Sequence, residues 1–509
     1  MFAKDAILDL GDNELTLSAT LLGKKAFEVS DGASLVLTNG VITMGDNAYG
    51  LQVYGTAIVA DGCTMTKLVN TTQGPIFDIY GKGTTSTDGG TVLVEAGAYI
   101  ESGADVFRHK KNGAGVAAQA NVYVTGGTLK APVTGNYCIF NASSYPSTDD
   151  VAVITGGTFL GKFEQTEKWG GMTLLGADAA DARFDDTAIV TATARLADGY
   201  EFAEAEEDGL WKVVKSPVAE IVGGGKYATL GEAIAALTGG ETIKLLDNYT
   251  AADDEVLTFN ASATFDLNSK TLTVPAAVAQ AGLYGVGADA EVTFTNGTVD
   301  TLGGVYNLKI LGKATIDCTM KIGVGAGSLP LMNIYGGTVI VTENAVLESC
   351  WDVFRTKDDG LTSTIVINGG SITAAKGQTG AGDSGGVFYH YKNHTLNLTI
   401  NDGIIDGGSK GVFCILNNAP MNCTLDDSCK AKFANTTRLT AFIAPGYELV
   451  QGDDDYYTIA RVTEQEYDEM VRVYAPLGSQ SNPTAETFRN KYVEKHTQVY
   501  EGWDLPDVL

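Results

Sequence analysis

The sequence predicts an all-β protein that folds as a solenoid of short strands, built twice in tandem and followed by a short, partly helical tail. Three observations predict this fold: a colinear internal duplication, a recurring strand-and-corner pattern, and one amphipathic helix suited to covering the end of a stack of strands. The chain of 509 residues holds 62 glycines and 11 prolines, which favours many tight corners, and its 44% hydrophobic content argues against disorder.

The two halves of the chain repeat the same motifs in the same order. Residues 8–17 (LDLGDNELTL) resemble residues 265–274 (FDLNSKTLTV) at an offset of 257 residues. Later matches, GADVFR with CWDVFR and GYEFAEAEEDGLWKV with GYELVQGDDDYYTI, lie at an offset of 247 residues. Loops of different length explain the drift in offset. We therefore predict copy one at residues 1–216, copy two at residues 217–462 and a separate tail at residues 463–509.

Within each copy a shorter unit recurs: alternating apolar residues, a Gly-rich corner, and Thr or Ser before another apolar residue. Examples are VYVTGGTL, AVITGGTF, NIYGGTVIV, IVINGGSI and LTINDGII. The corner glycines Gly127 and Gly157 are 30 residues apart, and Gly337 and Gly370 are 33 apart, which is one coil plus a projecting loop. Short strands joined by corners at near-constant spacing indicate a solenoid. A β-sandwich is the main alternative, but it needs neither aligned corners nor a covering helix.

Residues 226–249 (KYATLGEAIAALTGGETIKLLDNY) predict that covering helix and a strand after it. Thr229 and Glu232 form a capping box, the helix covers residues 229–237, and two glycines end it. Copy one has no equivalent, so either its natural start has been lost or a partner covers its open end. Each copy closes with a Gly-Tyr-Glu strand, an acidic turn and a second strand, which predicts a hairpin that caps the solenoid.

These features resemble the right-handed parallel β-helices of the pectin-lyase-like class, especially those in bacterial surface proteins. The resemblance rests on the stretch 226–249, on DLNSKTLTV (266–274) and on the repeat style of most of the chain. It implies a right-handed parallel β-helix in each copy, and it implies no particular activity. Enzymes of this class cleave polysaccharides, but the Asn-Thr-Asp, Gly-His-Gly and Arg-Ile-Lys signatures of the polygalacturonase-like branch do not occur, nor does an Asp cluster like the calcium site of a pectate lyase.

Charge and targeting signals limit the function classes. A net charge of −28 and a pI near 4.4 exclude nucleic acid and anionic membrane as natural partners. The start MFAKD has no apolar core of a signal peptide, and no apolar run is long enough to insert in a membrane. We expect either that an export signal was trimmed or that the protein leaves its cell by another route, as virion proteins do.

The cysteines predict no disulfide framework, because seven is an odd number. Two pairs occupy matched strand contexts and are expected to be small buried hydrophobes: Cys63 with Cys318, and Cys138 with Cys414. Cys423 and Cys429 could bridge across a loop, and their spacing matches no zinc motif.

Loops beside a second recurrent strand, which includes the two DVFR motifs, are predicted to lie on one side of the solenoid and to form its binding face. Their aromatic and basic residues suit a glycan or a host surface protein. The alternative is that the Asp and Arg of each DVFR motif are structural ion pairs repeated with the coil. The candidate residues are Arg108, His109, Lys110, Tyr145, Arg355, Lys357, Tyr389, Tyr391 and His394.

Catalytic chemistry has weak candidates. The paired acids Asp149-Asp150 and Asp358-Asp359 fit a glycosidase in principle, but both lie in Gly/Ser/Thr-rich loops where solvated acids are expected. His390 and His394 lie four residues apart with no nearby cysteine, so no metal site is expected, and no cofactor is implied.

The tail is predicted to form two short helices and to end in the apolar stretch EGWDLPDVL. It either packs back on the solenoid or docks on a partner subunit, which could be another copy, through Trp503, Leu505, Val508 and Leu509. The sequence thus favours a non-enzymatic β-helix protein for attachment or structural display, located outside the cell on a phage particle (as a fibre or decoration) or on a bacterial surface. The alternative function is a polysaccharide lyase or glycoside hydrolase of the same fold.

Overall fold

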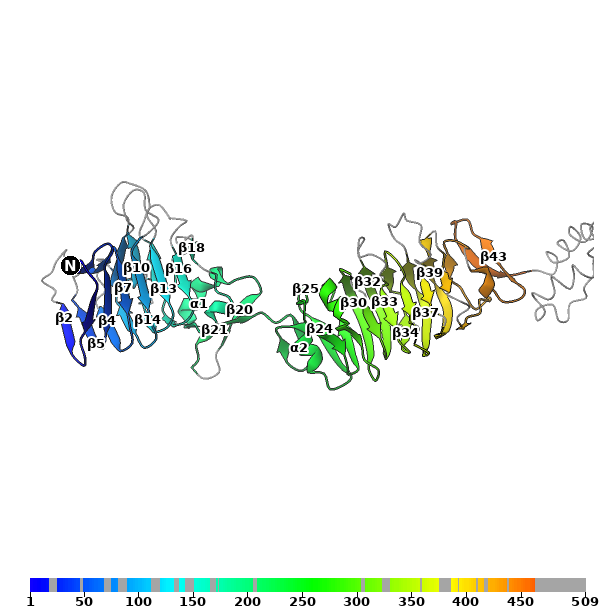
Figure 1. Cartoon of the computed structure of the whole chain (residues 1–509), viewed down its shortest axis with the longest axis horizontal. Helices are drawn as coiled ribbons and strands as arrows, with labels where there is room; N and C mark the ends of the chain where they lie inside the picture. The colour runs from blue at the N-terminus through cyan, green and yellow to red at the C-terminus, as the bar shows by residue number, and fades with distance from the viewer. Residues whose placement is uncertain are drawn as a thin grey trace, which may run out of the picture. The chain divides into compact units, whose positions relative to one another are not determined.

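The computed structural model describes residues 1–462 except 18–24, 46–48, 68–74, 81–88, 111–119, 132–136, 142–150, 165–170, 173, 205–207, 304–306, 323–329, 358, 375–385, 392, 409–410, 416–419 and 437–438. The predicted tail, residues 463–509, lies outside the described residues. The chain divides into two compact units, unit 1 (Met1–Ser216) and unit 2 (Pro217–Leu509). Both consist mainly of β-strands that pair in parallel (Figure 1), which confirms the predicted all-β class.

The described strands of unit 1 form three sheets, because most of them pair in parallel with the strand three places further along the chain. We call three successive strands, one in each sheet, a rung. The first sheet holds β1 (Ala6–Asp9), β4 (Ser34–Thr38), β7 (Thr56–Val59), β10 (Thr91–Val94), β13 (Asn121–Val124), β16 (Val151–Ile154) and β18 (Gly171–Met172). The second holds β2 (Glu14–Leu17), β5 (Gly40–Met44), β8 (Cys63–Lys67), β11 (Tyr99–Ser102), β14 (Thr128–Lys130), β17 (Thr158–Leu160) and β19 (Arg183–Phe184), and then a hairpin.

The third sheet of unit 1 holds β3 (Lys25–Val29), β6 (Tyr49–Val53), β9 (Phe77–Tyr80), β12 (Phe107–Lys110) and β15 (Ile139–Asn141). We call it the loop-side sheet of unit 1, because most of the longer connections of the unit begin or end at its strands.

Unit 2 repeats this plan with longer strands. Four strands, β30 (Glu291–Thr301), β32 (Lys313–Ile322), β37 (Thr362–Thr373) and β39 (Thr395–Asp406), run through the corner between two sheets, so that those sheets merge into one. The merged sheet also holds β24 (Glu241–Leu245), β25 (Tyr249–Thr250), β27 (Ala263–Asp266), β28 (Thr271–Val274), β34 (Thr338–Val341), β35 (Val346–Glu348), β41 (Met421–Asn422) and β42 (Lys432–Phe433).

The loop-side sheet of unit 2 is separate from the merged sheet. It holds β26 (Leu257–Phe259), β29 (Tyr284–Val286), β31 (Leu308–Ile310), β33 (Met332–Ile334), β36 (Phe354–Thr356), β38 (Phe388–His390) and β40 (Phe413–Ile415).

The core of each unit consists of columns of like residues, because the strands stack in register and their side chains alternate in direction. In unit 1, Leu37, Val59, Val94, Val124 and Ile154 lie side by side in successive strands and are all buried. Burying each such side chain stabilises the fold by about 1.5–3 kcal/mol.

Glycines form the predicted corners. Gly127 has a φ of 75°, and a Cβ there would lie 2.7 Å from the carbonyl oxygen of Ala98 in the preceding rung. Gly370 of unit 2 is alike, with a φ of 85° and a Cβ position 2.5 Å from the oxygen of Ala345. Both the left-handed conformation and the close backbone approach therefore require glycine at these corners.

A short helix lies near the start of unit 2, and each unit has a hairpin after its last parallel strand. Unit 2 begins with β22 (Ala219–Ile221), which pairs antiparallel with β23 (Lys226–Tyr227) and β24, and with helix α2 (Leu230–Ala235), whose capping box joins Thr229 and Glu232. The hairpin of β20 (Tyr200–Glu204) and β21 (Trp211–Lys215) pairs antiparallel with β19. In unit 2 the hairpin of β43 (Tyr447–Gln451) and β44 (Tyr457–Arg461) pairs in the same way with β42.

Two short helices were not predicted from the sequence: α1 (Asp186–Ala192), whose N-terminus the Asp185 carboxylate caps, and α3 (Ala276–Ala281). No helix in the described part of the chain is long and apolar enough to cross a membrane.

Candidate functional site

The outward face of the loop-side sheet of unit 2 presents one column of polar and aromatic side chains. Lys309, Asn333, Arg355 and Tyr389 are register partners in the successive strands β31, β33, β36 and β38. The residues just before them in these strands are Leu308, Met332, Phe354 and Phe388, all buried in the core. Alternation along each strand therefore points the column away from the core. Lys309, Arg355 and Tyr389 are half-buried there, whereas Asn333 is 0% exposed. We call these four residues the outward column of unit 2.

Aromatic rings and cations are in contact along this column. The guanidinium carbon of Arg355 lies 5.1 Å from the ring centroid of Tyr389, which in turn meets Tyr391 edge to face at 5.2 Å. Lys309 lies over Tyr335, with its Nζ 5.2 Å from the ring centroid. Such contacts between cations and aromatic faces contribute about 0.5–1 kcal/mol each at exposed sites, and they hold the rings in fixed orientations.

A buried carboxylate fixes the position of Arg355. Its Nε donates to Oδ2 of Asp352 at 2.9 Å, and the Asp352 side chain is 0% exposed while that of Arg355 is 13% exposed. Burial, and next the neighbouring charge of Arg355, lower the pKa of Lys357 at the end of the same segment. The segment therefore holds two neighbouring cationic side chains, of which Arg355 pairs with the buried Asp352.

Unit 1 carries the equivalent column with different chemistry. Glu28, Gln52, Asp78 and Arg108 are register partners on its loop-side sheet. Nε of Arg108 donates to Oδ1 of Asp78 at 2.6 Å, and the Asp78 side chain is 0% exposed.

Aromatic residues flank this column and a neighbouring groove. The rings of Tyr54 and Tyr80 stack with their centroids 4.7 Å apart. A polar groove of about 360 Å³ lies beside Tyr54, and Asp5, Ser34, Thr56, Thr91 and Asn121 line it.

The predicted binding residues are only partly brought together. Arg355, Lys357, Tyr389 and Tyr391 are half-buried neighbours in unit 2, and Arg108 is half-buried in unit 1. His109 and His394 are instead buried, with exposed fractions of 1% and 0%, which corrects their placement among the surface residues. His109 takes an inward position of β12, in register with Ile79. The side chain of Lys110, and Tyr145, Trp503, Leu505, Val508 and Leu509, lie outside the described residues.

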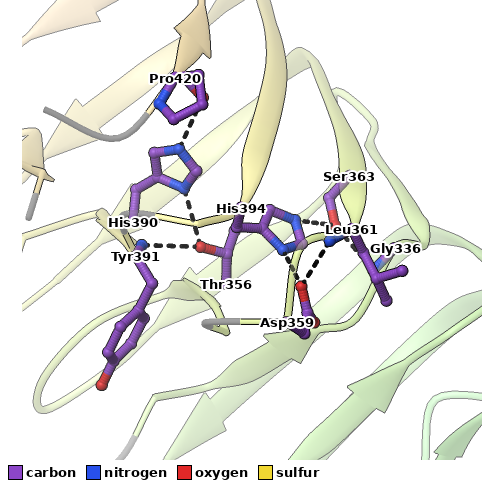
Figure 2. Close-up of polar contacts among 9 residues, drawn as sticks. All are labelled: Gly336, Thr356, Asp359, Leu361, Ser363, His390, Tyr391, His394 and Pro420. Atoms are coloured by element: carbon purple, nitrogen blue, oxygen red, sulfur yellow. Dashed lines mark hydrogen bonds and ion pairs between the residues drawn. The ribbon is translucent and has the colours of Figure 1, made fainter.

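A buried polar network in unit 2 was not predicted from the sequence (Figure 2). Nδ1 of His394 donates to Oδ1 of Asp359 at 2.7 Å, and Nε2 of the same ring accepts from the Ser363 hydroxyl at 2.8 Å. Asp359 also accepts the backbone N–H of Leu361 at 2.9 Å, and Ser363 accepts that of Gly336 at 3.1 Å. This order of carboxylate, imidazole and hydroxyl resembles a hydrolase triad.

Burial favours a structural role for this network. Ser363 and His394 are both 0% exposed, so a substrate has no approach to the hydroxyl. Asp359 was expected to be a solvated acid, but its side chain is only 20% exposed and pairs with His394. The residues of the network lie in three separate segments of the chain, at Gly336, at Asp359–Ser363 and at His394, so no local motif could reveal them.

A second histidine lies beside this network, with its ring centroid 5.9 Å from that of His394. Nε2 of His390 donates to the carbonyl of Pro420 at 2.9 Å, and Nδ1 accepts from the Thr356 hydroxyl at 2.9 Å (Figure 2). Thr356 in turn accepts the N–H of Tyr391 at 3.1 Å. Burial, the largest effect, lowers the pKa of His390, so the neutral ring is favoured. These hydrogen bonds connect the end of β38 to Thr356 in β36 and to Pro420, which precedes β41.

Within the described residues, no three His, Cys, Asp or Glu side chains are grouped so that they could hold a metal ion. Cys423 and Cys429 are free thiols and form no bridge. Cys63 and Cys318 are buried as expected, and burial raises their pKa values to about 11 and about 12, so both thiols stay protonated.

Comparison of the chain with protein-family models gives no match, and comparison with curated proteins gives no significant match.

Proposed function

We propose that each unit is a right-handed parallel β-helix of the pectin-lyase-like class. The parallel pairing of strands in successive rungs supports this, as do the in-register columns, the glycine corners and the hairpin at the end of each unit.

The protein acts, in this proposal, as a non-enzymatic attachment or display module outside the cell, as a phage fibre or decoration or on a bacterial surface. Its ligand is a glycan or a host surface protein. A structural partner subunit, or another copy of the chain, docks on residues 463–509.

The observation that carries the proposal is the outward column of unit 2. Tyr389 is held by Arg355 on one face and meets Tyr391 at its edge, and Arg355 is itself anchored by buried Asp352. A rigid aromatic ring beside a cationic donor suits the apolar face and hydroxyl groups of a sugar, and it loses little conformational entropy on binding.

Binding of the full chain to panels of glycans and host surface proteins tests the proposal. Replacing Tyr389 by Ala should weaken binding of the best ligand about tenfold, which corresponds to about 1.4 kcal/mol. Tyr123→Ala is the matched control, because Tyr123 is a strand tyrosine that is 36% exposed on a different sheet. Equal loss in both variants, or no loss with Tyr389→Ala, would contradict the proposed site.

Cleavage of polysaccharides remains the second candidate function. Incubation with pectins, alginate, mucins and capsular polysaccharides should release neither unsaturated nor reducing ends. Release of such ends that Asp149→Asn, Asp150→Asn, Asp358→Asn or Asp359→Asn abolishes would establish the enzyme instead.

A further inference from the structure

Two buried histidines lie directly behind the tyrosines of the outward face of unit 2. His390 is the residue between Tyr389 and Tyr391, and its ring points to the other side of the chain from the Tyr391 ring (Figure 2). His390 and His394 are both 0% exposed, and their rings meet edge to face with centroids 5.9 Å apart. Imidazole is the side chain whose charge changes near neutral pH, so a change of pH acts at the back of these tyrosines.

A chain of hydrogen bonds connects Tyr391 to the His390 ring. The backbone N–H of Tyr391 donates to the Thr356 hydroxyl oxygen at 3.1 Å, and the same hydroxyl donates to Nδ1 of His390 at 2.9 Å. Nε2 of His390 donates to the carbonyl of Pro420 at 2.9 Å, so Nδ1 of the neutral ring carries no proton and can accept. Thr356 is 2% exposed and thus shielded from solvent. The arrangement therefore fits the neutral form of His390.

Protonation of His390 disrupts this chain of hydrogen bonds. With a proton on both ring nitrogens, Nδ1 becomes a donor, and the Thr356 hydroxyl loses the acceptor of its own hydrogen. The Thr356 oxygen then faces two donors, the imidazolium and the N–H of Tyr391, while its hydrogen has to turn elsewhere in a buried site. A buried polar group that loses its partner is costly, so the charged ring and Tyr391 no longer share Thr356.

Charges around the ring oppose a further positive charge. Arg355 and Lys357, on the neighbouring strand segment, are both half-buried cations. A charge on His394 lowers the pKa of His390 as well, after the larger effect of burial. Asp359 does not offset these charges, because it accepts from Nδ1 of His394 at 2.7 Å. The charged and titratable side chains in the described parts of residues 354–361, 386–394 and 420–422 and of the starts of β37 and β39, which surround the ring, are Arg355, Lys357, Asp359, Tyr389, Tyr391 and His394.

We propose that His390 is an acid-sensitive latch for the attachment site: protonation of its ring releases Tyr391 from Thr356, and the site then releases its ligand. The inference rests on the proposed function, which places the ligand at Tyr389 and its neighbour Tyr391. The two rings meet edge to face at 5.2 Å, so a displaced Tyr391 also frees the edge of Tyr389. Binding is therefore strong at neutral pH and weak in acid. Because burial lowers the pKa of His390, release takes place below about pH 6.5, the ordinary pKa of histidine.

Hydrogen exchange of single amides in the ligand-free full chain tests the latch without any ligand. From about pH 7.5 to about pH 4.5, after correction for the intrinsic exchange rate, protection of the Tyr391 amide should fall at least about tenfold. The Phe388 amide, which donates to Val412 at 3.0 Å in the same strand, is the matched control and should stay protected, also in every variant. His390→Gln cannot be protonated and should remove the pH dependence. Thr356→Val removes the hydroxyl and should leave the Tyr391 amide poorly protected at both pH values.

Binding measurements separate the latch from the attachment function. The panel ligand whose binding Tyr389→Ala weakens should bind the unaltered chain at least about tenfold more weakly at about pH 4.5 than at about pH 7.5, and His390→Gln should reduce this difference to less than about twofold. Failure of every panel ligand to bind at about pH 7.5 would overturn the attachment function, whereas a Tyr391 amide that responds to pH would still support the latch.

Three results would overturn the latch. The first is protection of the Tyr391 amide that does not change with pH. The second is an equal change in the unaltered chain and in His390→Gln. The third is a pH dependence that His394→Gln removes and His390→Gln does not, which would assign the effect to the other ring.

Discussion

Leu10 and Leu267 occupy matched positions in the two units but differ in burial, so the same substitution can be compared at both. Each residue follows a matched parallel strand, β1 or β27, and donates its backbone N–H to a carbonyl of the next rung, at 3.2 Å to Thr38 and at 2.9 Å to Thr295. Leu267 is 0% exposed, whereas Leu10 is half-buried. Replacing each by Ala removes the same atoms from the same place in the fold.

The two costs should differ because only one substitution leaves a cavity. Leu267→Ala removes a fully covered side chain, and we expect unit 2 to lose about 3 kcal/mol, within the 2–5 kcal/mol typical of such changes. At Leu10 water can fill the space, so only part of the transfer free energy is lost, and we expect unit 1 to lose about 1 kcal/mol.

Urea unfolding of the full chain, monitored by hydrogen exchange, assigns each loss of unfolding free energy to its unit. Thr16→Ala and Thr273→Ala are the matched controls, because both residues lie between inward-facing neighbours, and each should change stability by no more than about 0.5 kcal/mol. Equal losses from Leu10→Ala and Leu267→Ala would refute the reasoning from burial.

Three further predictions concern charges and the tail. The lowered pKa of His390 means that the folded state resists protonation, so unit 2 should lose stability as pH falls below about 6.5, and His390→Gln should reduce this loss in pH-dependent unfolding. Burial raises the pKa of Asp105 to about 6, so its ionised form destabilises unit 1; Asp105→Asn should stabilise it by about 1–2 kcal/mol at pH 7 and by nothing below about pH 4, and a constant difference would contradict this. Deleting residues 463–509 should leave the melting temperature of the β-sheet units unchanged and abolish assembly with a partner subunit; a truncated chain that unfolds, or that still assembles, would be inconsistent with docking.

The fold was largely predictable because its signals are local and repeated. The Gly-rich corners predict where each strand ends, and the capping box at Thr229 predicts α2 to within a few residues. The hairpins follow from their acidic turns in the same way. Helix α1 was missed because its seven residues, DTAIVTA, include β-branched residues that weaken the helical pattern. The N-cap residue Asp185 indicates where a helix begins but not how long the helix is.

The candidate site was less predictable, since its side chains meet across rungs. His109 was assigned to the surface because it follows Arg108 in a polar stretch, but strand alternation places it inward beside Ile79. His394 likewise lies in a polar stretch, and its partners Asp359 and Ser363 are 35 and 31 residues away in the sequence. Only the register of neighbouring rungs reveals such contacts.

The two DVFR motifs show how register decides chemistry. In unit 1 the register partner of Arg108 in the preceding rung is Asp78, and the guanidinium pairs with that carboxylate, while Asp105 accepts the N–H of Tyr137 in the next rung. In unit 2 the residue at the place of Asp78 is Asn333, which carries no charge, and Arg355 pairs instead with Asp352 of its own motif.

This exchange of partners has a consequence for binding. Because Arg355 pairs within its own strand segment, its planar face is available for the next rung. There its guanidinium carbon lies 5.1 Å from the ring centroid of Tyr389. Identical local sequence therefore yields an ion pair between rungs in unit 1 and a cation–aromatic surface in unit 2. That difference is the physical reason for placing the proposed attachment site on unit 2.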